Sequence, residues 1–230
     1  MMKARRSVLI ASIVVALLLI TIPLFAPTFF VVQIGIQSLF LGIVALSLIF
    51  LAGYGGMVSL VQVALYGVAG YVYAILTVTY NAPWYVGVLA GLLFTCVLSA
   101  LFALIAIRTQ GIYFLMITLA QAMLVYFYVN QDRIFAGGHS GINGVRPPIV
   151  GALDLADPIA FYYMTLIIVA LTYLGLYYLL RAPFGLALQG VRDNSQRMRS
   201  LGYRTSAHRV AAFTLAGFIA ALGGIIGVWY

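Results

Sequence analysis

The stretch WYVGVLAGLLFTCVLSALFALIAI, from Trp84 to Ile107, contains no charged residue and no proline. An α-helix needs about 20 apolar residues to cross the hydrocarbon core of a bilayer, because it rises ~1.5 Å per residue. The run meets that length, and its few polar side chains are small and uncharged. It therefore predicts a transmembrane helix.

Similar apolar runs lie on both sides of this one, separated by short breaks that contain glycine, proline or charged residues. These runs are Ser7–Ala26, Phe29–Ala52, Val58–Thr79, Gly111–Asn130, Ile159–Leu180 and Val210–Tyr230. The chain is 65% hydrophobic and 7% charged, with a mean hydropathy of +1.14, whereas a soluble domain is about a quarter charged. We expect an all-α polytopic transmembrane helical bundle of about seven spans, a single domain over residues 1–230, with a broken helix near Gly53–Gly56.

The basic residues are concentrated on one side of this predicted bundle. With a cytoplasmic N-terminus, alternating spans place ten of the twelve Lys and Arg residues in cytoplasmic segments and only Arg133 and Arg146 on the opposite face. The ten are Lys3, Arg5, Arg6, Arg108, Arg181, Arg192, Arg197, Arg199, Arg204 and Arg209. This follows the positive-inside rule and predicts a multi-pass membrane protein whose N-terminus is cytoplasmic. The net charge of +8 is explained by this one-sided placement of basic residues at the lipid bilayer. No nucleic-acid partner is therefore expected.

Ionisable residues are missing from the interior of the predicted spans. No Asp, Glu or Lys lies inside a span, which argues against a proton-coupled pump or a voltage sensor. Sodium coupling through backbone carbonyl groups stays open. A nucleotide-binding G-x-x-x-x-G-K-[ST] loop is excluded because the one lysine is Lys3. We expect no cofactor and no metal in this chain, and we expect a partner to supply the energy for transport.

Neutral polar side chains recur within the spans at helical spacing. Ser59, Gln62 and Tyr66 follow the glycine break at positions i, i+3 and i+7, on one helix face. The complete set is Gln33, Gln37, Ser59, Gln62, Tyr66, Thr118 and Gln121. Such residues either line a translocation pathway or form hydrogen bonds between helices. The sequence leaves both interpretations open.

The segment Gly138-His139-Ser140-Gly141 matches the G-x-S-G motif of rhomboid proteases. A serine nucleophile needs a histidine base within hydrogen-bond reach. The second histidine, His208, is predicted on the opposite membrane face, and Pro147-Pro148 prevents the helix that rhomboids place after the serine. We therefore favour a glycine-rich external loop over a membrane protease.

The polar segment Arg181–Arg209 lies between the last two spans, on the predicted cytoplasmic side. Its sequence predicts a short basic amphipathic helix over Arg192–Leu201, which Gly202 ends. Such a helix can lie on an anionic lipid surface or fit a groove of another protein.

Taken in order, these motifs resemble one family, the LivM-like inner-membrane permease subunits of branched-chain amino acid ABC transporters. The resemblance extends from about Gly35 to the end of the chain. Its carriers are Gly53/Gly56 with Ser59-Leu60, Gly67 and Tyr71, Arg108 with Gly111 and Tyr113, Gly137-Gly138…Gly141…Gly144, Phe184-Gly185, Ala187-Leu188, Arg192-Asp193-Asn194, Leu201-Gly202 and Phe213.

The resemblance implies a transport subunit and not an enzyme, located in the cell inner membrane, with branched-chain (aliphatic) amino acids as cargo. It implies three kinds of partner: a homologous permease subunit, two cytoplasmic ATPase subunits that carry ATP and Mg²⁺, and an external substrate-binding protein. Residues 181–209 would be the cytoplasmic coupling loop, contacting the ATPase through Arg192, Asp193, Asn194, Arg197, Leu201 and Gly202.

Two alternatives stay open beside this interpretation. Urea or small amides are other cargoes within the same family, and a self-sufficient secondary transporter is a different class. Family members continue for further helices, so we also expect the chain to be truncated at Tyr230.

Overall fold

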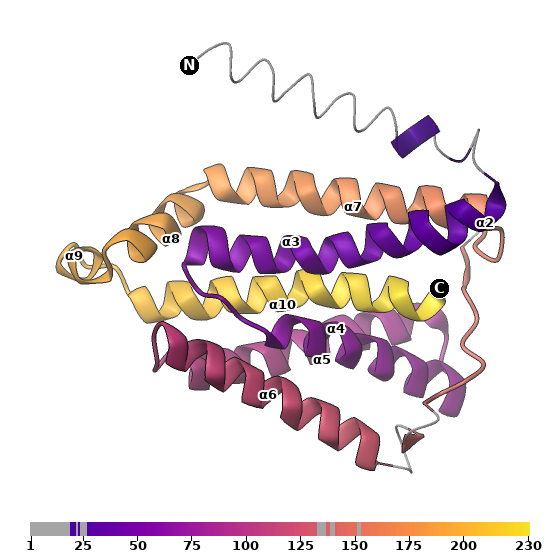
Figure 1. The fold of residues 1–230 in the computed structure, drawn as a ribbon, viewed down its shortest axis with the longest axis horizontal. Helices are drawn as coiled ribbons and strands as arrows, with labels where there is room; N and C mark the ends of the chain where they lie inside the picture. The colour runs from indigo at the N-terminus through magenta and orange to yellow at the C-terminus, as the bar shows by residue number, and fades with distance from the viewer. Residues whose placement is uncertain (1–18, 22, 24–26, 133–136, 139–140, 151–152) are drawn as a thin grey trace.

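The computed structural model describes residues 19–21, 23, 27–132, 137–138, 141–150 and 153–230. Those residues form helices in chain order, with one short hairpin between α6 and α7 (Figure 1). The helices are α2 (Thr28–Phe30), η1 (Val31–Ile36, π-helical), α3 (Gln37–Gly55), α4 (Val61–Ala74), η2 (Ile75–Thr79, π-helical), α5 (Trp84–Ala106), α6 (Ile112–Gln131), α7 (Pro158–Arg181), α8 (Pro183–Asp193), α9 (Ser195–Ser200) and α10 (Thr205–Trp229). The hairpin pairs β1 (Ile149–Val150) with β2 (Leu153–Asp154) in antiparallel register.

Within the described residues, six helices are long and apolar enough to cross a membrane: Val31–Gly55, Val61–Thr79, Trp84–Ala106, Ile112–Gln131, Pro158–Arg181 and Thr205–Trp229. They coincide with the predicted spans from Phe29 onward, so the helical-bundle prediction is confirmed. The remaining predicted span, Ser7–Ala26, falls almost entirely outside the described residues. The last span begins at Thr205, earlier than the predicted Val210, because His208 and Arg209 interrupt the apolar pattern but not the helix.

Helix α10 lies at the centre of the bundle. It packs most extensively against α4, α5 and α3, and it is the most buried of the six long helices. Figure 1 shows α3 and α7 on one side of it and α4, α5 and α6 on the other. Because α10 contacts α3 on one side and α4 and α5 on the other, it joins the two sides of the bundle into one body.

The glycine break lies where α3 ends. Gly56 has the left-handed conformation (φ 65°) that favours glycine, and its N–H donates to the carbonyl of Leu51. Residues Gly56 to Leu60 are then non-helical before α4 begins at Val61. The predicted break is therefore a connection between two spanning helices.

Close approach between α4 and α10 depends on small residues. A Cβ on Gly70 would lie less than 3.0 Å from Val228, and one on Gly224 would lie less than 3.0 Å from the Tyr66 carbonyl oxygen. Gly91 brings α5 similarly close to the backbone at Ala69. Small side chains at such contacts let membrane helices pack backbone against backbone.

Candidate functional site

Thr118 on α6 supports the non-helical chain that precedes α4. Its Oγ1 accepts a hydrogen bond from the backbone N–H of Leu60 (3.3 Å) and donates to the carbonyl of Leu115 (3.0 Å). Backbone groups outside a helix need such partners when they lie within a membrane domain. Thr118 is fully buried, so this contact fixes the Ser59-Leu60 turn against α6.

The predicted polar residues Ser59, Gln62, Thr118 and Gln121 are all buried. Gln121 donates from Nε2 to the Phe102 carbonyl (3.1 Å) and so ties α6 to α5. Ser99 on α5 in turn donates to the Phe213 carbonyl of α10 (3.1 Å). These contacts are interhelical hydrogen bonds of the kind the sequence left as an alternative.

Gln62 differs from Thr118 and Gln121, whose side chains form the hydrogen bonds described above. It is fully buried, and neither its amide nitrogen nor its amide oxygen has a hydrogen-bond partner among the described residues. The Oγ of Ser59 is likewise buried without a hydrogen-bond partner among the described residues. A buried polar group left unpaired costs about 1–3 kcal/mol. Packing alone gives no reason for an amide at this position.

The remaining predicted pathway residues lie outside this buried group. Gln33 in η1 and Gln37 at the start of α3 are both exposed. Tyr66 is half-buried on α4, and its ring stacks on Phe40 (centroids 6.2 Å apart, interplanar angle 14°). The predicted set thus divides into a buried group of four, an exposed pair, and Tyr66.

A pocket of about 460 Å³ opens beside Tyr66. Its walls come from α4, α10 and the loop between α6 and α7, with Tyr66, Gly67, Gly70 and Tyr71 on the α4 side. Sequence reasoning missed this pocket because it is made from three segments far apart in the chain. Gly67 and Tyr71 were the available signal, since both belong to the family pattern.

The segment between α7 and α10 folds as two helices, so the prediction of a single helix over Arg192–Leu201 is wrong. Asn194 has an extended backbone (φ −154°, ψ 92°), and its side-chain oxygen accepts from the Arg197 N–H (2.9 Å) as the N-cap of α9. This cap ends α8 at Asp193. The predicted stop at Gly202 is confirmed: it has φ 87°, donates to Arg199, and is followed by a Tyr203 N–H bond to the Met198 carbonyl.

Arg192 connects this segment to the glycine break. Its Nη1 donates to the Gly53 carbonyl, and its Nε donates to Asp193 Oδ1 (2.9 Å). Its aliphatic stem covers Gly56 so closely that a Cβ there would lie 2.6 Å from the Arg192 Cγ. The α8 helix is thus joined to the end of α3 and to the turn that leads into α4.

A second contact joins the segment to the central helix. Arg199 on α9 donates from Nε to the Thr205 Oγ1 (3.1 Å) at the first residue of α10. The α8–α9 segment therefore contacts the bundle through α3 and α10, while Arg197 and Leu201 point away from it, with Leu201 67% exposed. Arg192, Asn194 and Gly202 shape the segment, and Arg197 and Leu201 are free to meet a partner.

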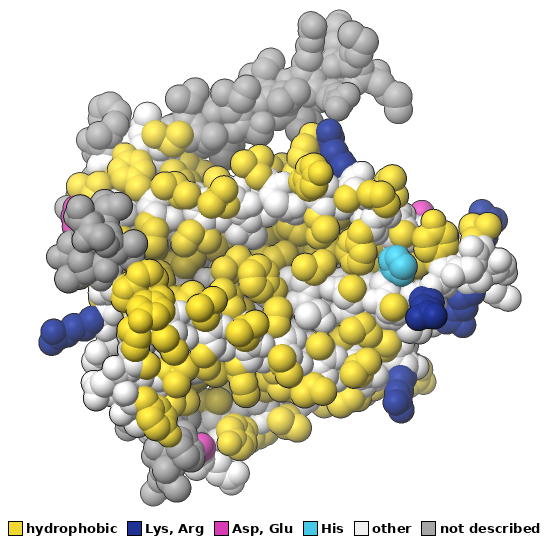
Figure 2. Space-filling view, turned by 180° about the vertical axis from the view of Figure 1, so that it is seen from behind, with side chains coloured by type: hydrophobic (Ala, Val, Ile, Leu, Met, Phe, Trp, Pro, Cys, Tyr) yellow, Lys and Arg dark blue, Asp and Glu magenta, His cyan; other side chains and the backbone are white. Residues whose placement is uncertain are grey.

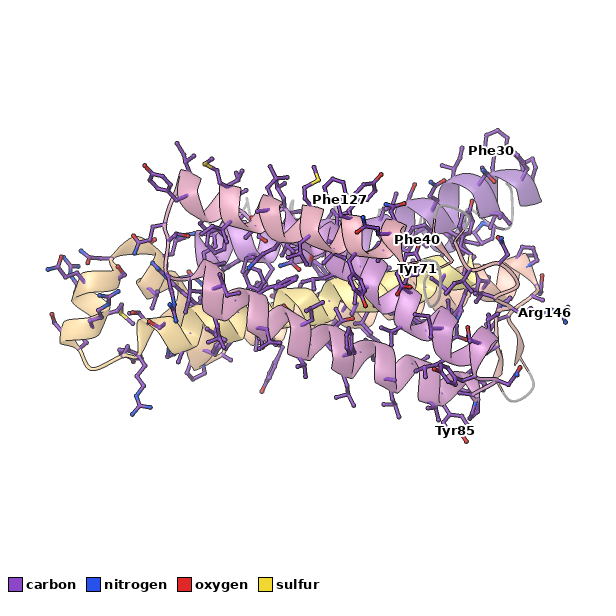
Figure 3. All side chains as sticks on the ribbon, turned by 90° about the horizontal axis from the view of Figure 1, so that it is seen from below. Phe30, Phe40, Tyr71, Tyr85, Phe127 and Arg146 are labelled. Atoms are coloured by element: carbon purple, nitrogen blue, oxygen red, sulfur yellow. The ribbon has the colours of Figure 1, made fainter. Side chains whose placement is uncertain are left out.

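The charged side chains are distributed unevenly between the two ends of the bundle. Figure 2 shows a largely hydrophobic face with arginines gathered at the end that carries α8 and α9. Arg146 lies at the opposite end of the bundle (Figure 3). This is the placement expected when one end faces the cytoplasm.

Comparison with known proteins accords with these features. Residues 30–230 match the family described as "Branched-chain amino acid transport system / permease component". The chain is similar to the high-affinity branched-chain amino acid transport system permease protein LivM of Salmonella typhimurium, at 25% identity over 143 residues. It is also similar to LivM of Escherichia coli, at 24% identity over 143 residues.

Each of these two matches covers 52% of this chain and 34% of the relative, so the matched region spans about a third of the relatives' length. No solved structure shows a significant match. The family match covers most of the chain and includes all six spanning helices. The chain therefore belongs to the family of branched-chain amino acid transport system permease components, and it is a multi-pass membrane protein.

Proposed function

We propose that this chain is the permease subunit of an ATP-driven importer for branched-chain (aliphatic) amino acids in the cell inner membrane. The observation that carries the proposal is the family match over residues 30–230. The two LivM relatives, which are named as branched-chain amino acid permeases, support the same cargo. The chain would form half of a translocation pathway, with a homologous permease subunit forming the other half.

In this proposal residues 181–209 dock on a cytoplasmic ATPase subunit. The support is structural: the segment projects from one end of the bundle (Figure 1), is rich in arginine, and exposes Arg197 and Leu201. Movement of α9 would reach the spans through Arg192 and Thr205. Two ATPase subunits carrying ATP and Mg²⁺ would supply the energy, and an external binding protein would deliver the amino acid.

The polar residues then have separate roles. Tyr66 contacts the pocket directly. The buried Ser59 and Gln62 come next to the turn that Arg192 contacts, so they are placed to meet the substrate when α3 and α4 separate. Thr118 and Gln121 hold α6 against this region, while Gln33 in η1 and Gln37 at the start of α3 are exposed.

The alternatives differ in energy source or in cargo. A secondary transporter would move its solute down an ion gradient without an ATPase, and urea or a small amide would replace the amino acid within the same importer. The described lining of the pocket includes apolar residues as well as polar ones, and this favours an aliphatic amino acid over urea.

The first test is a pull-down of the tagged, full-length protein in mild detergent, followed by mass spectrometry. We expect a second permease and an ATPase with a Walker A motif to co-purify. Reconstituted with these partners and the binding protein, the complex should take up leucine in proportion to ATP hydrolysis. Leucine uptake driven by an ion gradient in vesicles that hold the chain alone would contradict the proposal and establish a secondary transporter.

A further inference from the structure

The pocket beside Tyr66 lies in the half of the bundle away from α8 and α9. Figure 3 shows Tyr71, which lines it, nearer to Arg146 than to the α8–α9 end. The α6–α7 loop closes one side through Gly141 to Val145, and α10 contributes Gly224 and Val228. The volume of about 460 Å³ falls within the ~300–1,000 Å³ that small-molecule pockets occupy.

Glycines on α4 and α10 make the space for this pocket. At Gly70 and Gly224 the two helices are in backbone contact, and an added Cβ would collide with the neighbouring helix. At Gly67 the situation is reversed, because an added Cβ would meet no atom within 4 Å. Gly67 therefore faces open space, and any side chain there would project into it.

The described lining combines apolar and polar groups and includes no charged residue. The Tyr71 hydroxyl lies on the side of Gly141, an amide comes from Asn143, and the loop contributes backbone groups. Such groups can hydrogen-bond both the carboxylate and the ammonium of a zwitterion. They offer no countercharge to an ion of net charge, which would then be buried without a partner.

A second hollow of about 440 Å³ lies beside the first. It shares Gly67 and Tyr71 with the first pocket, and its walls are mainly apolar side chains of α4 and α6 such as Val63, Leu119 and Met123. A pocket with uncharged polar groups beside an apolar hollow suits a small molecule with a zwitterionic head and a hydrocarbon tail.

We propose that this paired pocket is the substrate-binding site within the membrane domain. The amino-acid head group lies against Tyr66, Tyr71 and Asn143, and the aliphatic side chain passes Gly67 into the apolar hollow. The site selects net-neutral aliphatic amino acids over lysine or glutamate. This inference rests on the proposed transport function and adds the location and the basis of selection.

The test uses a thiol placed in the pocket. Cys96 is the sole cysteine of the sequence, so Cys96→Ala gives a cysteine-free background in which Gly67→Cys is introduced. Gly42→Cys on α3 is the matched control, because Gly42 also has no atom within 4 Å of an added Cβ but does not line the pocket. Labelling by a small, uncharged, water-soluble thiol reagent is followed in the reconstituted complex with saturating leucine, lysine or glutamate.

Leucine should slow labelling at position 67 several-fold, lysine and glutamate should not, and position 42 should be insensitive to all three. Equal labelling at position 67 with and without leucine overturns the proposal. So does a thiol at position 67 that never reacts, since the pocket would then be closed.

Filling the pocket is an independent test. Gly67→Leu should abolish leucine uptake while the complex still assembles and hydrolyses ATP, and Gly42→Leu should transport normally. Normal uptake by Gly67→Leu overturns the pocket assignment but leaves the transport function standing. If the unmodified complex takes up no leucine at all, it is the transport function that fails.

Discussion

Gly224 shows how a single hydrogen atom in place of a side chain determines helix packing. Its neighbour across the interface is the Tyr66 carbonyl, so the contact is with backbone, which cannot rotate away. The same contact holds Tyr66 at the edge of the pocket. Packing and site geometry therefore depend on one position.

We expect Gly224→Ala to destabilise the protein by about 1–3 kcal/mol, the usual cost of overpacking. Thermal unfolding can be followed by the reaction of the half-buried Cys96 with a thiol-reactive dye. Gly42→Ala is the control, since its Cβ would contact nothing. An unchanged midpoint for Gly224→Ala would show that α4 and α10 can separate without cost.

At Gln62 we expect a substitution that does not destabilise the protein, because the amide is buried without hydrogen-bond partners among the described residues. Replacement of an unpaired polar group by an apolar one of similar size is neutral or stabilising. Gln62→Leu should therefore keep or raise the unfolding midpoint and lower leucine uptake, as should Ser59→Ala to a smaller degree. Uptake at the normal rate in both variants would remove these two residues from the translocation pathway.

At the scale of the helix, Arg192 is a joint between α8 and the end of α3. Arg192→Met keeps an aliphatic stem over Gly56 but removes the hydrogen bond to Gly53 and the ion pair with Asp193. We expect the complex to assemble and hydrolyse ATP, with leucine transported per ATP falling several-fold. Arg181→Met, which loses a contact with Tyr177, serves as a control of equal charge.

An unaltered transport-to-hydrolysis ratio in Arg192→Met would show that the joint transmits no motion. Loss of assembly would instead assign Arg192 to the docking surface itself. Co-purification of the ATPase separates these two results.

The long elements were predictable because apolar length alone determines them. Trp84–Ile107 was expected and Trp84–Ala106 is found; Ile159–Leu180 was expected and Pro158–Arg181 is found. The segment between α7 and α10 was harder to predict, because hydropathy says little about it and local capping determines where its helices begin and end. Asn194 was the missed signal: its cap splits one expected helix into α8 and α9.

The pathway prediction shows the limit of periodicity. Ser59, Gln62 and Tyr66 were placed on one helix face, but Ser59 precedes α4 and Tyr66 reaches a pocket while Gln62 is sealed inside. Which of several polar residues meets open space depends on neighbouring helices and on the α6–α7 loop. The spacing of residues in the sequence does not reveal the positions of the neighbouring helices or of this loop.

At the scale of the whole molecule, charge asymmetry predicts orientation. In the Cys96→Ala background, Asn143→Cys should react with a membrane-impermeant maleimide in spheroplasts, and Gln196→Cys should react only after permeabilisation. Both positions are exposed, so accessibility depends on the side of the membrane. The reverse pattern would place α8 and α9 outside and exclude an ATPase as their partner.

Helix α10 spans the molecule as one unbroken element of 25 residues, roughly 37 Å long. Its first residue bonds to Arg199 of α9, and near its far end Gly224 and Val228 line the pocket. Two ligands that each shift the position of one helix are thermodynamically linked, and the linkage is reciprocal. Whatever factor ATPase docking applies to the affinity for leucine, leucine must apply to the affinity for the ATPase, so a titration begun at either end yields the same interaction free energy.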